Sequence, residues 1–551
     1  MHHESICRRW LGALGAAVCA LVLLTSGQAE AAEYYVAPDG SDANDGSLAQ
    51  PFATLSKANG AAAAGDTVWL RGGTYYITSQ VVLSKSGTSD TNRTKLWAYA
   101  GEKPVLDASQ YVTSNRAVDV PVVLVTGSWM HLRGFELANA KTGNSGDHSY
   151  SLLRTKGSSN NTFELLHLHH AFGPALFIDG GNGGNLILNC DAHDNYDQDG
   201  SQGDGQNGDG FGVHYQTTGP TTVIRGCRAW SNSDDGYDYI SQEVPVITEG
   251  CFAMSNGRGS GGNGNGFKVG SSKTGIRHIV RNNVAWKNKA AGFYANHSAG
   301  GNTWLNNTSY SNGTQYNMLA SSWDENDNRT DGVILMGERV HRMRNNIGFP
   351  NKNSNMEGVD SEFNTWDLSI AEAADAFEST SDAGCTGPRE VNGSMPTACS
   401  FMKLKAGGSL IDKGTDVELP FVGAAPDLGA YELGAAPISG SGGAEPAGGA
   451  SGSSGSSAGG AGAGGAGPTA GGAASCGRTG SGGFPASGGA GAGAGQAGSG
   501  SPGAPATPGD EAAAGCSCIV AGSPRAAQGT WACLLLALTL IRRERRLRRK
   551  G

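Results

Sequence analysis

The sequence has no Cys-x-x-Cys pattern, and its share of apolar residues is small for a chain of 551 residues. The first absence removes the usual sign of a cysteine-rich zinc site. An apolar fraction of 38% argues against several ordinary domains. Glycine is abundant instead, with 88 residues that are unevenly distributed. Residues 438–508 are almost entirely Gly, Ala, Ser and Pro and cannot build a core, so we expect the folded part to precede them.

The N-terminus has the layout of an export signal. Arg8 and Arg9 precede an apolar run, Leu11–Leu24, which ends in small residues around Ala31. A short apolar run between basic and small residues is typical of a secretory signal peptide rather than of a membrane span. We therefore expect cleavage near Ala31 and a secreted protein.

The C-terminus has the layout of a second targeting signal, which has three parts. Gly515–Cys518 is followed by an apolar stretch, Trp531–Ile541, and then by seven basic residues between 542 and 550. The apolar stretch barely spans a bilayer, and the basic cluster would stay on the cytoplasmic side. This tail resembles the cysteine-containing C-terminal sorting signals of myxobacterial surface proteins, which implies Cys516 as the processing or anchoring residue. A poorly ordered tail with a weak membrane anchor is the alternative.

These boundaries divide the chain into four expected segments. They are a signal peptide at 1–31, one folded domain at 32–433, a disordered linker at 434–512, and a sorting or membrane-anchor segment at 513–551. Gly65–Tyr75 is predicted to form the opening coil of the domain, and Pro426–Glu432 its closing strand. Among the 11 cysteines, Cys385 and Cys399 could pair once the chain is exported.

The charge of the chain limits its partners. The basic residues of the terminal cluster, together with Glu544, carry a net charge of +6, so their removal changes the formal net charge from −9 to −15. So acidic a body should not bind nucleic acid by electrostatics. It would also repel an acidic polysaccharide unless a cation bridged the two.

A repeat of about 24 residues occupies the middle of the folded region. Asparagine recurs in one register, at Asn195, Asn232, Asn256, Asn288 and Asn312. A glycine followed by an aromatic residue recurs in a second column, at residues 210–211, 236–237, 266–267 and 292–293. No helical pattern and no Leu-x-x-Leu-x-Leu motif accompanies the repeat, so it predicts stacked β coils. Cys190, Cys227 and Cys251 form a third column, expected to be small buried core groups for which a disulfide is not required.

The register of the repeat brings charged residues together. Asp209 and Asp235 each precede a corner glycine, with Asp234 beside Asp235, and Asp238 and Lys268 each stand two residues after one. Because adjacent coils lie about 4.8 Å apart, these side chains should converge. A cluster of carboxylates without His or Cys favours a hard cation, and Ca²⁺ over Mg²⁺. The alternative is that these aspartates only stabilise turns, where Asp is common.

This pattern resembles that of the family 9 polysaccharide lyases, pectate lyases that fold as a right-handed parallel β-helix. The family has an Asp on one coil, Asp-Asp-x-x-Asp on the next and a catalytic Lys on the third. The resemblance covers roughly residues 33–432 and implies an all-β fold, a calcium cofactor and an acidic polysaccharide substrate. Its residue roles would place Ca²⁺ on Asp209, Asp234, Asp235 and Asp238, with Lys268 as the base.

The chemistry is consistent with that role. In β-elimination a base removes the proton α to a uronate carboxylate, and a bound cation stabilises the developing charge. Lysine has an ordinary pKa of about 10.4, so it must be shifted down by a nearby cation and partial desolvation. An alkaline optimum is therefore expected. The family resemblance implies pectate as the substrate, and we expect the protein to be a monomer.

Other residues are weaker candidates. Arg258, Lys287 and Lys289 could hold uronate carboxylates, although a solvated surface explains them more simply. His167, His169 and His170 are interpreted as structural. Two other functions are kept open: a β-helical glycoside hydrolase that uses paired aspartates, and a non-enzymatic calcium-binding adhesion or carbohydrate-binding protein.

Overall fold

The computed structural model describes residues 31–435, apart from 114–116, 142, 143, 145, 325, 327 and 373. The predicted signal peptide up to residue 30 lies outside the described residues. So do the linker and the sorting segment from residue 436 onward, including Cys516. Within the described part of the chain, no helix has the length and apolar character needed to span a membrane.

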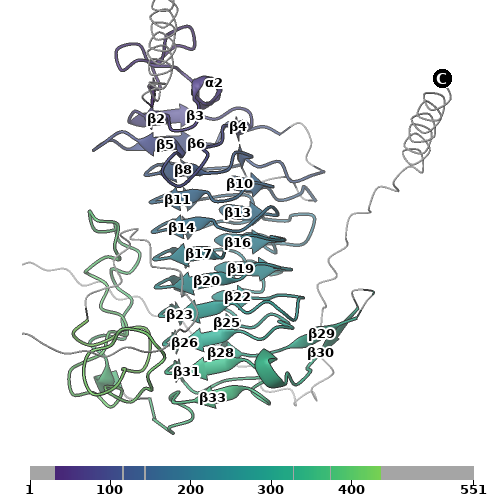
Figure 1. Ribbon diagram of the computed structural model, residues 1–551, viewed down its shortest axis with the longest axis vertical. Coiled ribbons are helices and arrows are strands. Elements are labelled where there is room, and N and C mark those ends of the chain that lie inside the picture. Colours follow the sequence, from purple (N-terminus) through teal and green to yellow (C-terminus); the bar gives the residue numbers. More distant parts are fainter. Residues whose placement is uncertain are drawn as a thin grey trace, which may run out of the picture. The chain divides into compact units, whose positions relative to one another are not determined.

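Nearly all strands of the described region belong to three parallel sheets that run along the molecule (Figure 1). The first sheet is β1 (Glu33–Val36), β2 (Thr67–Leu70), β5 (Thr94–Ala98), β8 (Met130–Arg133), β11 (Thr162–Glu164), β14 (Leu186–Leu188), β17 (Thr222–Arg225), β20 (Val246–Glu249), β23 (Ile279–Arg281), β26 (Thr303–Leu305), β31 (Arg342–Arg344) and β33 (Asp360–Glu362). The second is β3 (Gly73–Tyr76), β6 (Pro104–Asp107), β9 (Glu136–Ala138), β12 (His167–His169), β15 (Asp191–His193), β18 (Arg228–Trp230), β21 (Phe252–Met254), β24 (Val284–Trp286), β27 (Thr308–Tyr310) and β32 (Ile347–Phe349). The third is β4 (Val81–Leu83), β7 (Val123–Val125), β10 (Leu153–Lys156), β13 (Leu176–Asp179), β16 (Phe211–His214), β19 (Tyr237–Ile240), β22 (Phe267–Val269), β25 (Ala291–Tyr294) and β28 (Thr314–Asn317).

From β2 to β28, each coil of the chain contributes one strand to each sheet in turn. The chain passes through β17, β18 and β19 and then begins the next coil at β20, which pairs with β17. The coils therefore stack as a right-handed parallel β-helix, and the predicted fold class is confirmed. The opening coil is also confirmed, since β2 and β3 lie within or beside the predicted Gly65–Tyr75 segment.

A few elements lie outside the coils. Helix α2 (Leu55–Ala61) lies at the N-terminal end of the stack, with Thr54 as its N-cap and Leu55 and Ala58 buried (Figure 1). The hairpin of β29 (Ser321–Trp323) and β30 (Arg329–Asp331) is antiparallel. Two 3₁₀ turns follow, η1 (Gly337–Arg339) and η2 (Ala374–Ala376).

The aromatic column forms the centre of the core. Phe211, Tyr237, Phe267 and Phe293 are fully buried and stack on one another, with ring centroids 4.5–5.2 Å apart. Because side chains alternate along a strand, each aromatic residue that points inward leaves the next residue pointing outward. Because the aromatic side chains of this column point into the core, the side chain of the residue after each of them points out of the coil.

The asparagine column is a hydrogen-bonded ladder at the corner between the second and third sheets. The Asn288 side-chain oxygen accepts from the Asn256 backbone N–H at 3.1 Å and from the Asn256 side-chain amide at 2.9 Å. Asn288 in turn donates to Asn312 Oδ1 at 2.9 Å. Each amide thus satisfies a backbone donor of the preceding coil that would otherwise be buried without a partner.

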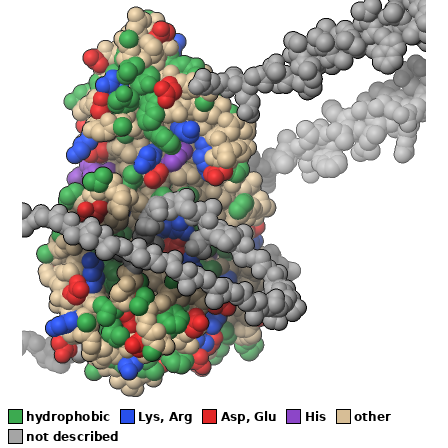
Figure 2. Space-filling view, turned by 60° about the vertical axis from the view of Figure 1, so that its left-hand side comes forward, with side chains coloured by type: hydrophobic (Ala, Val, Ile, Leu, Met, Phe, Trp, Pro, Cys, Tyr) green, Lys and Arg blue, Asp and Glu red, His purple; other side chains and the backbone are tan. Residues whose placement is uncertain are grey.

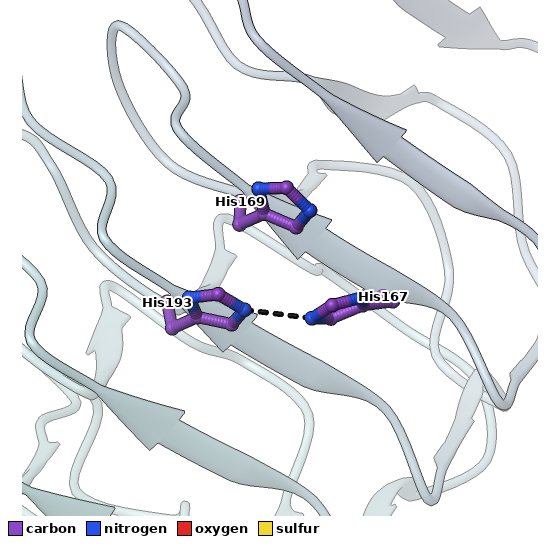
Figure 3. Close-up of side chains that lie close together, drawn as sticks. All are labelled: His167, His169 and His193. Atoms are coloured by element: carbon purple, nitrogen blue, oxygen red, sulfur yellow. Dashed lines mark hydrogen bonds between the residues drawn. The ribbon is translucent and has the colours of Figure 1, made fainter. Parts of the chain in front are cut away.

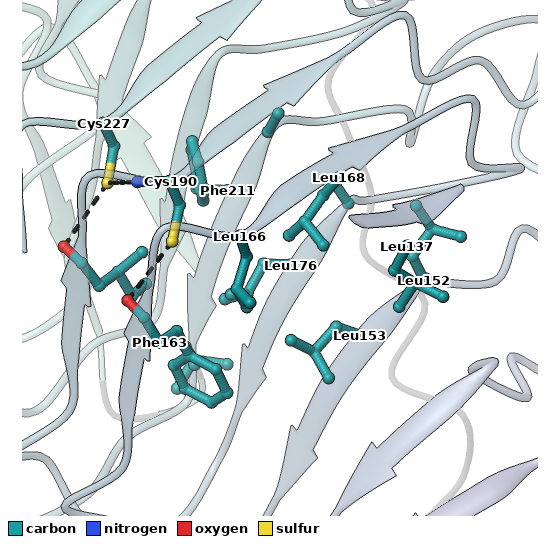
Figure 4. Close-up of a cluster of buried hydrophobic side chains, with 14 of the residues drawn as sticks. Leu137, Leu152, Leu153, Phe163, Leu166, Leu168, Leu176, Cys190, Phe211 and Cys227 are labelled. Carbon is teal, nitrogen blue, oxygen red and sulfur yellow. Dashed lines mark hydrogen bonds between the residues drawn. The ribbon is translucent and has the colours of Figure 1, made fainter. Parts of the chain in front are cut away.

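The cysteine column also supplies acceptors for buried backbone N–H groups, at the corner between the first and second sheets (Figure 4). The backbone N–H of Cys190 donates to Cys227 Sγ at 3.4 Å, and that of Cys227 donates to Cys251 Sγ at 3.3 Å. All three cysteines are free and buried, as expected for small core groups. Cys385 and Cys399, by contrast, form the disulfide that the sequence suggested.

The segment after β33 packs against the second sheet. Phe401 contacts Trp286 with ring centroids 4.6 Å apart, and Arg228 Nη1 donates to the Cys385 carbonyl at 2.7 Å. The predicted closing strand is wrong: Pro426–Glu432 contains no strand. Leu428 is fully buried there, and the Gly429 N–H donates to the Asn345 carbonyl at 2.7 Å. The buried side chains of this segment belong to an irregular stretch that packs against the coils, and not to a paired strand.

Candidate active site

The predicted acidic residues and Lys268 converge where coils enter the third sheet. Asp238 of β19 is in register with Lys268 of β22, which is in register with Tyr294 of β25. Gly212 of β16 precedes Asp238 in the same row. The register predicted from the repeat is therefore the register of the folded chain.

The corner glycines allow the coils to approach closely at this site. A Cβ at Gly236 would lie 2.7 Å from the Gly266 carbonyl oxygen, and a Cβ at Gly266 would lie 2.6 Å from the Gly292 carbonyl oxygen. A side chain at these positions would push neighbouring coils apart. The glycine column is thus required by the stacking that brings the charged residues together.

Three aspartates are held by backbone donors. Asp209 Oδ1 accepts from the Asp235 N–H at 3.0 Å, and Asp235 Oδ1 accepts from the Asn265 N–H at 2.6 Å. Asp234 Oδ1 accepts from the Asn263 N–H at 2.5 Å. These contacts run opposite to the asparagine ladder, because Asp209 and Asp235 each accept from a backbone N–H of the coil that follows. One oxygen of each carboxylate is fixed in this way, and these three residues can place one ligand oxygen each within 4.8 Å of the others.

Lys268 occupies the centre of this cluster. Its Nζ lies 3.0 Å from Asp235 Oδ2 and 3.3 Å from Asp238 Oδ2, and its side chain is 12% exposed. Asp238 Oδ1 is buried and has no hydrogen-bond partner among the described residues. The amine therefore faces two carboxylates, while the second oxygen of Asp238 accepts no hydrogen bond from the described residues.

Burial and mutual repulsion shift the titration of the cluster. Burial first, and then the neighbouring carboxylates, raise the pKa of Asp209 and of Asp234 well above the ordinary value. The pKa of Asp235 is raised by burial as well, although Lys268 opposes it. Burial also acts to raise the pKa of Asp238, but Lys268 and His214 outweigh it and the pKa is lowered.

The pKa of Lys268 itself is raised well above its ordinary value. Burial alone would lower it, but the charges of Asp235, Asp238 and the two other aspartates have the larger combined effect. In this form of the protein the amine is a cation that neutralises part of the carboxylate charge. A second cation bound by the carboxylates would act in the opposite direction on the Lys268 pKa.

The donor set fits a hard divalent cation. The four aspartates are buried to 5% exposure or less, carry oxygen ligands only, and include the unpartnered Asp238 Oδ1. Buried carboxylates without compensating charge are strongly unfavourable, and oxygen-only clusters of this kind suit Ca²⁺. These residues could therefore hold a calcium ion.

His214 is a site residue that the sequence reasoning missed. Its Nε2 lies 3.6 Å from Asp238 Oδ2, and its ring contacts Phe177 edge-to-face at 4.7 Å. It stands two residues after Gly212 and is in register with Asp179 and Ile240. The neighbouring coils therefore carry no histidine at this position. Side chains alternate along a strand, so His214 points outward like the position of Gly212. This alternation is the sequence signal from which His214 could have been predicted.

The three weaker candidates are each engaged by other protein groups. Arg258 Nη1 lies 3.3 Å from Asp194 Oδ1, and Lys287 Nζ lies 2.9 Å from Asp382 Oδ2. Lys289 Nζ donates to the Gly262 carbonyl at 2.7 Å and so supports the loop of residues 257–264. Their part in substrate binding stays a prediction.

Comparisons with known proteins agree with this architecture. The model of the Pel9A-like, right-handed beta helix region matches residues 34–328. Pectate lyase L of Dickeya dadantii (strain 3937) is 33% identical over 426 residues, which cover 74% of this chain and 92% of the relative. Pectate lyase L of Paenibacillus polymyxa (strain SC2) is 32% identical over 418 residues, or 70% and 84% of the two chains.

Two solved structures are similar as well. The crystal structure of pectate lyase Pel9A matches with a TM-score of 0.62 and 32% identity, covering 74% of this chain and 98% of that one. A rhamnogalacturonan lyase matches with a TM-score of 0.59 and 31% identity, covering 68% and 96%.

Proposed function

Because this chain belongs to the Pel9A-like family of right-handed β-helix proteins and is a polysaccharide lyase, we propose that it cleaves pectate by calcium-dependent β-elimination. In this proposal Asp209, Asp234, Asp235 and Asp238 hold the calcium ion, and Lys268 is the base. The observation that carries it is the placement of Lys268 Nζ within 3.3 Å of both Asp235 and Asp238.

The reaction needs one proton acceptor and stabilisation of negative charge. Lys268 Nζ takes the proton from the carbon α to the uronate carboxylate, the carbon–carbon double bond forms, and the glycosidic oxygen leaves with its electron pair. The leaving oxygen then acquires a proton and becomes a new chain end. When bound, calcium supplies the positive charge that stabilises the developing carboxylate charge and joins an acidic protein to an acidic glycan.

The side chains around Lys268 determine when it can act. The amine accepts a proton only when neutral, and the four aspartates favour its charged form. Cation binding to those carboxylates is thus what makes Lys268 a usable base. Tyr294, the next residue in the row, is largely buried and donates to or accepts from His297 Nε2 at 2.9 Å, so it borders the base on the other side.

The test is a lyase assay on the full chain with polygalacturonate and, in parallel, rhamnogalacturonan. We expect ultraviolet absorbance of unsaturated uronate with calcium and none after chelation. Lys268→Ala should lose about 10²–10⁴-fold in rate, the usual contribution of a positioned base. Lys273→Ala is the matched control, because Lys273 is exposed and pairs with Glu243.

Each alternative has its own outcome. Sugar release without the absorbance change would indicate hydrolysis, and calcium-dependent binding without cleavage would indicate an adhesion protein. Absorbance with rhamnogalacturonan alone would move the substrate to that glycan, as the second structural relative suggests. Full activity in Lys268→Ala would remove this residue as the base.

We further propose that the enzyme works outside the cytoplasm as a monomer, retained at the cell surface by its C-terminal tail. The disulfide of Cys385 and Cys399 supports an oxidising compartment. Cell fractionation of the full chain and of a chain ending at residue 512 would test the anchor. Release of only the shorter chain into the medium is the expected result.

A further inference from the structure

Three histidines converge on the outer face of the second sheet, far in the chain from Lys268. His167 and His169 are alternate residues of β12, and His193 of β15 is in register with His169 (Figure 3). The residues between and beside them, Leu168 and Ala192, are fully buried, so the imidazoles point outward. One ring nitrogen of each histidine lies within 4.8 Å of the others.

A carboxylate is hydrogen-bonded to one of these rings, and a second carboxylate lies near another. His193 Nδ1 lies 2.8 Å from Asp194 Oδ2, and His167 Nδ1 lies 3.6 Å from Glu136 Oε2. A neutral imidazole that donates from Nδ1 to a carboxylate carries its lone pair on Nε2. The two Nε2 atoms face each other at 2.7 Å. A proton carried by His167 Nε2 can be donated to the lone pair of His193 Nε2, and a metal ion that displaces this proton would bind both nitrogens.

The third histidine completes the group. His169 Nε2 contacts Glu136 Oε1 at 3.1 Å, and its Nδ1 faces His170 Nδ1 at 2.7 Å. Its ring stacks on that of His193 with centroids 4.8 Å apart. A metal bound at His169 would replace one of its two nitrogen contacts. Trp230 stacks on the other side of His193, 4.1 Å away, and keeps that ring in place.

We propose that His167, His169 and His193 form a binding site for a divalent transition-metal ion of the zinc type, oriented by Glu136 and Asp194. Imidazole nitrogens suit zinc and its neighbours, whereas calcium takes oxygen ligands. The site is open to solvent, because the His167 side chain is 43% exposed. Histidine side chains also reach the surface in the view of Figure 2. The metal would join two neighbouring coils and is separate from the carboxylate cluster of the third sheet.

Zinc binding to the untagged full chain would test the site by calorimetry in excess calcium, which occupies the carboxylate cluster. We expect one tight zinc equivalent in the wild-type chain that is absent in the His167→Gln, His193→Gln double variant. Asp194→Asn should retain the site but weaken zinc affinity about 10–100-fold, because it frees the orientation of His193. His131→Gln is the matched control, since His131 pairs with Glu164 at 2.9 Å on the first sheet.

Cobalt binding gives a second readout. Co²⁺ in a site of imidazole ligands should give visible absorption bands in the wild type and in His131→Gln, and none in the double variant. Equal zinc uptake by the wild type and the double variant would overturn the proposal. So would the absence of any tight equivalent, which would mean that the two Nε2 atoms share a proton instead.

Discussion

Lys268 Nζ lies 3.0 Å from Asp235 Oδ2, although the two residues belong to different coils of the chain. The ion pair joins the proposed base directly to a proposed calcium ligand. Protonation of the amine and occupation of the carboxylates by a cation are therefore coupled, because each adds positive charge to the same cluster.

The lyase rate should rise with pH. The aspartates hold the Lys268 pKa well above its ordinary value against the opposing effect of burial. A cation bound to these carboxylates would lower it again. The neutral amine is the active form, so kcat/KM at saturating calcium should increase through the alkaline range. A pH profile of kcat/KM checks this. An acidic optimum would contradict the role of Lys268.

Calcium should affect stability more at high pH than at low pH. The folded-state pKa values of Asp209 and Asp234 are raised by burial and by neighbouring carboxylates. Between about 3.9, the ordinary aspartate pKa, and the raised values, the folded chain binds more protons than the unfolded chain. The free energy of unfolding without calcium therefore falls as the pH rises through this window. Asp238 has a lowered pKa and titrates below the window.

Thermal unfolding with and without chelator measures this effect. Calcium at 100 times its Kd should add about 2.7 kcal/mol to the free energy of unfolding. Because calcium binds the ionised carboxylates, the gap between the two unfolding temperatures at a fixed calcium concentration should be wider at pH 8 than at pH 5. Asp234→Asn removes one repelling charge and should narrow the gap, while the exposed Asp39→Asn should not. A gap that does not depend on pH would show that the cluster is not the calcium site.

The asparagine ladder should be a large local source of stability. Asn288→Ala removes the acceptor of the Asn256 backbone N–H and side-chain amide, and two donations, to the Ala253 carbonyl and to Asn312 Oδ1. Each buried group left unpaired costs about 1–3 kcal/mol, so we expect a total loss of about 3–5 kcal/mol in urea denaturation. The exposed Asn351→Ala should change the free energy of unfolding by less than about 0.5 kcal/mol.

The buried charge cluster at Asp191 should fix the C-terminal segment to the second sheet. Asp191 lies 2.6 Å from Arg228 Nη2 and 2.7 Å from Arg389 Nη2. Burial opposes its charge, but the two guanidinium groups lower its pKa to about 2. Asp191→Asn should cost about 3–5 kcal/mol, because it leaves two buried cations without a counter-charge.

The pH dependence of that cluster has a definite sign. Asp191 stabilises the fold above the ordinary aspartate pKa, and this contribution is lost as the pH falls through about 2. Asp191→Asn should therefore lower stability at pH 7 and much less at pH 2, as measured by urea denaturation. Glu243→Gln breaks an exposed ion pair with Lys273 and serves as the control, with a change within about 1 kcal/mol.

Much of the site could be predicted from the sequence because a solenoid repeats its own register. The columns at Gly236 and Gly266 fix which residues are neighbours, so the contact of Asp238 with Lys268 follows from counting along the chain. The inward aromatic residues follow from the same period. His214 was missed because it repeats nowhere. Pro426–Glu432 was misassigned because alternating residues such as Leu428 and Ala430 are also found in buried irregular segments.

The sequence by itself determined the coil period, the inward and outward positions, and the row that contains Asp238 and Lys268. These features are periodic, so local counting reproduces them. Only the tertiary structure decided that Lys268 is paired to two carboxylates, that Arg389 meets Asp191, and that the rings of His167 and His193 face each other. Such contacts depend on side-chain direction and on segments without a repeat, and both are set by how the whole chain packs.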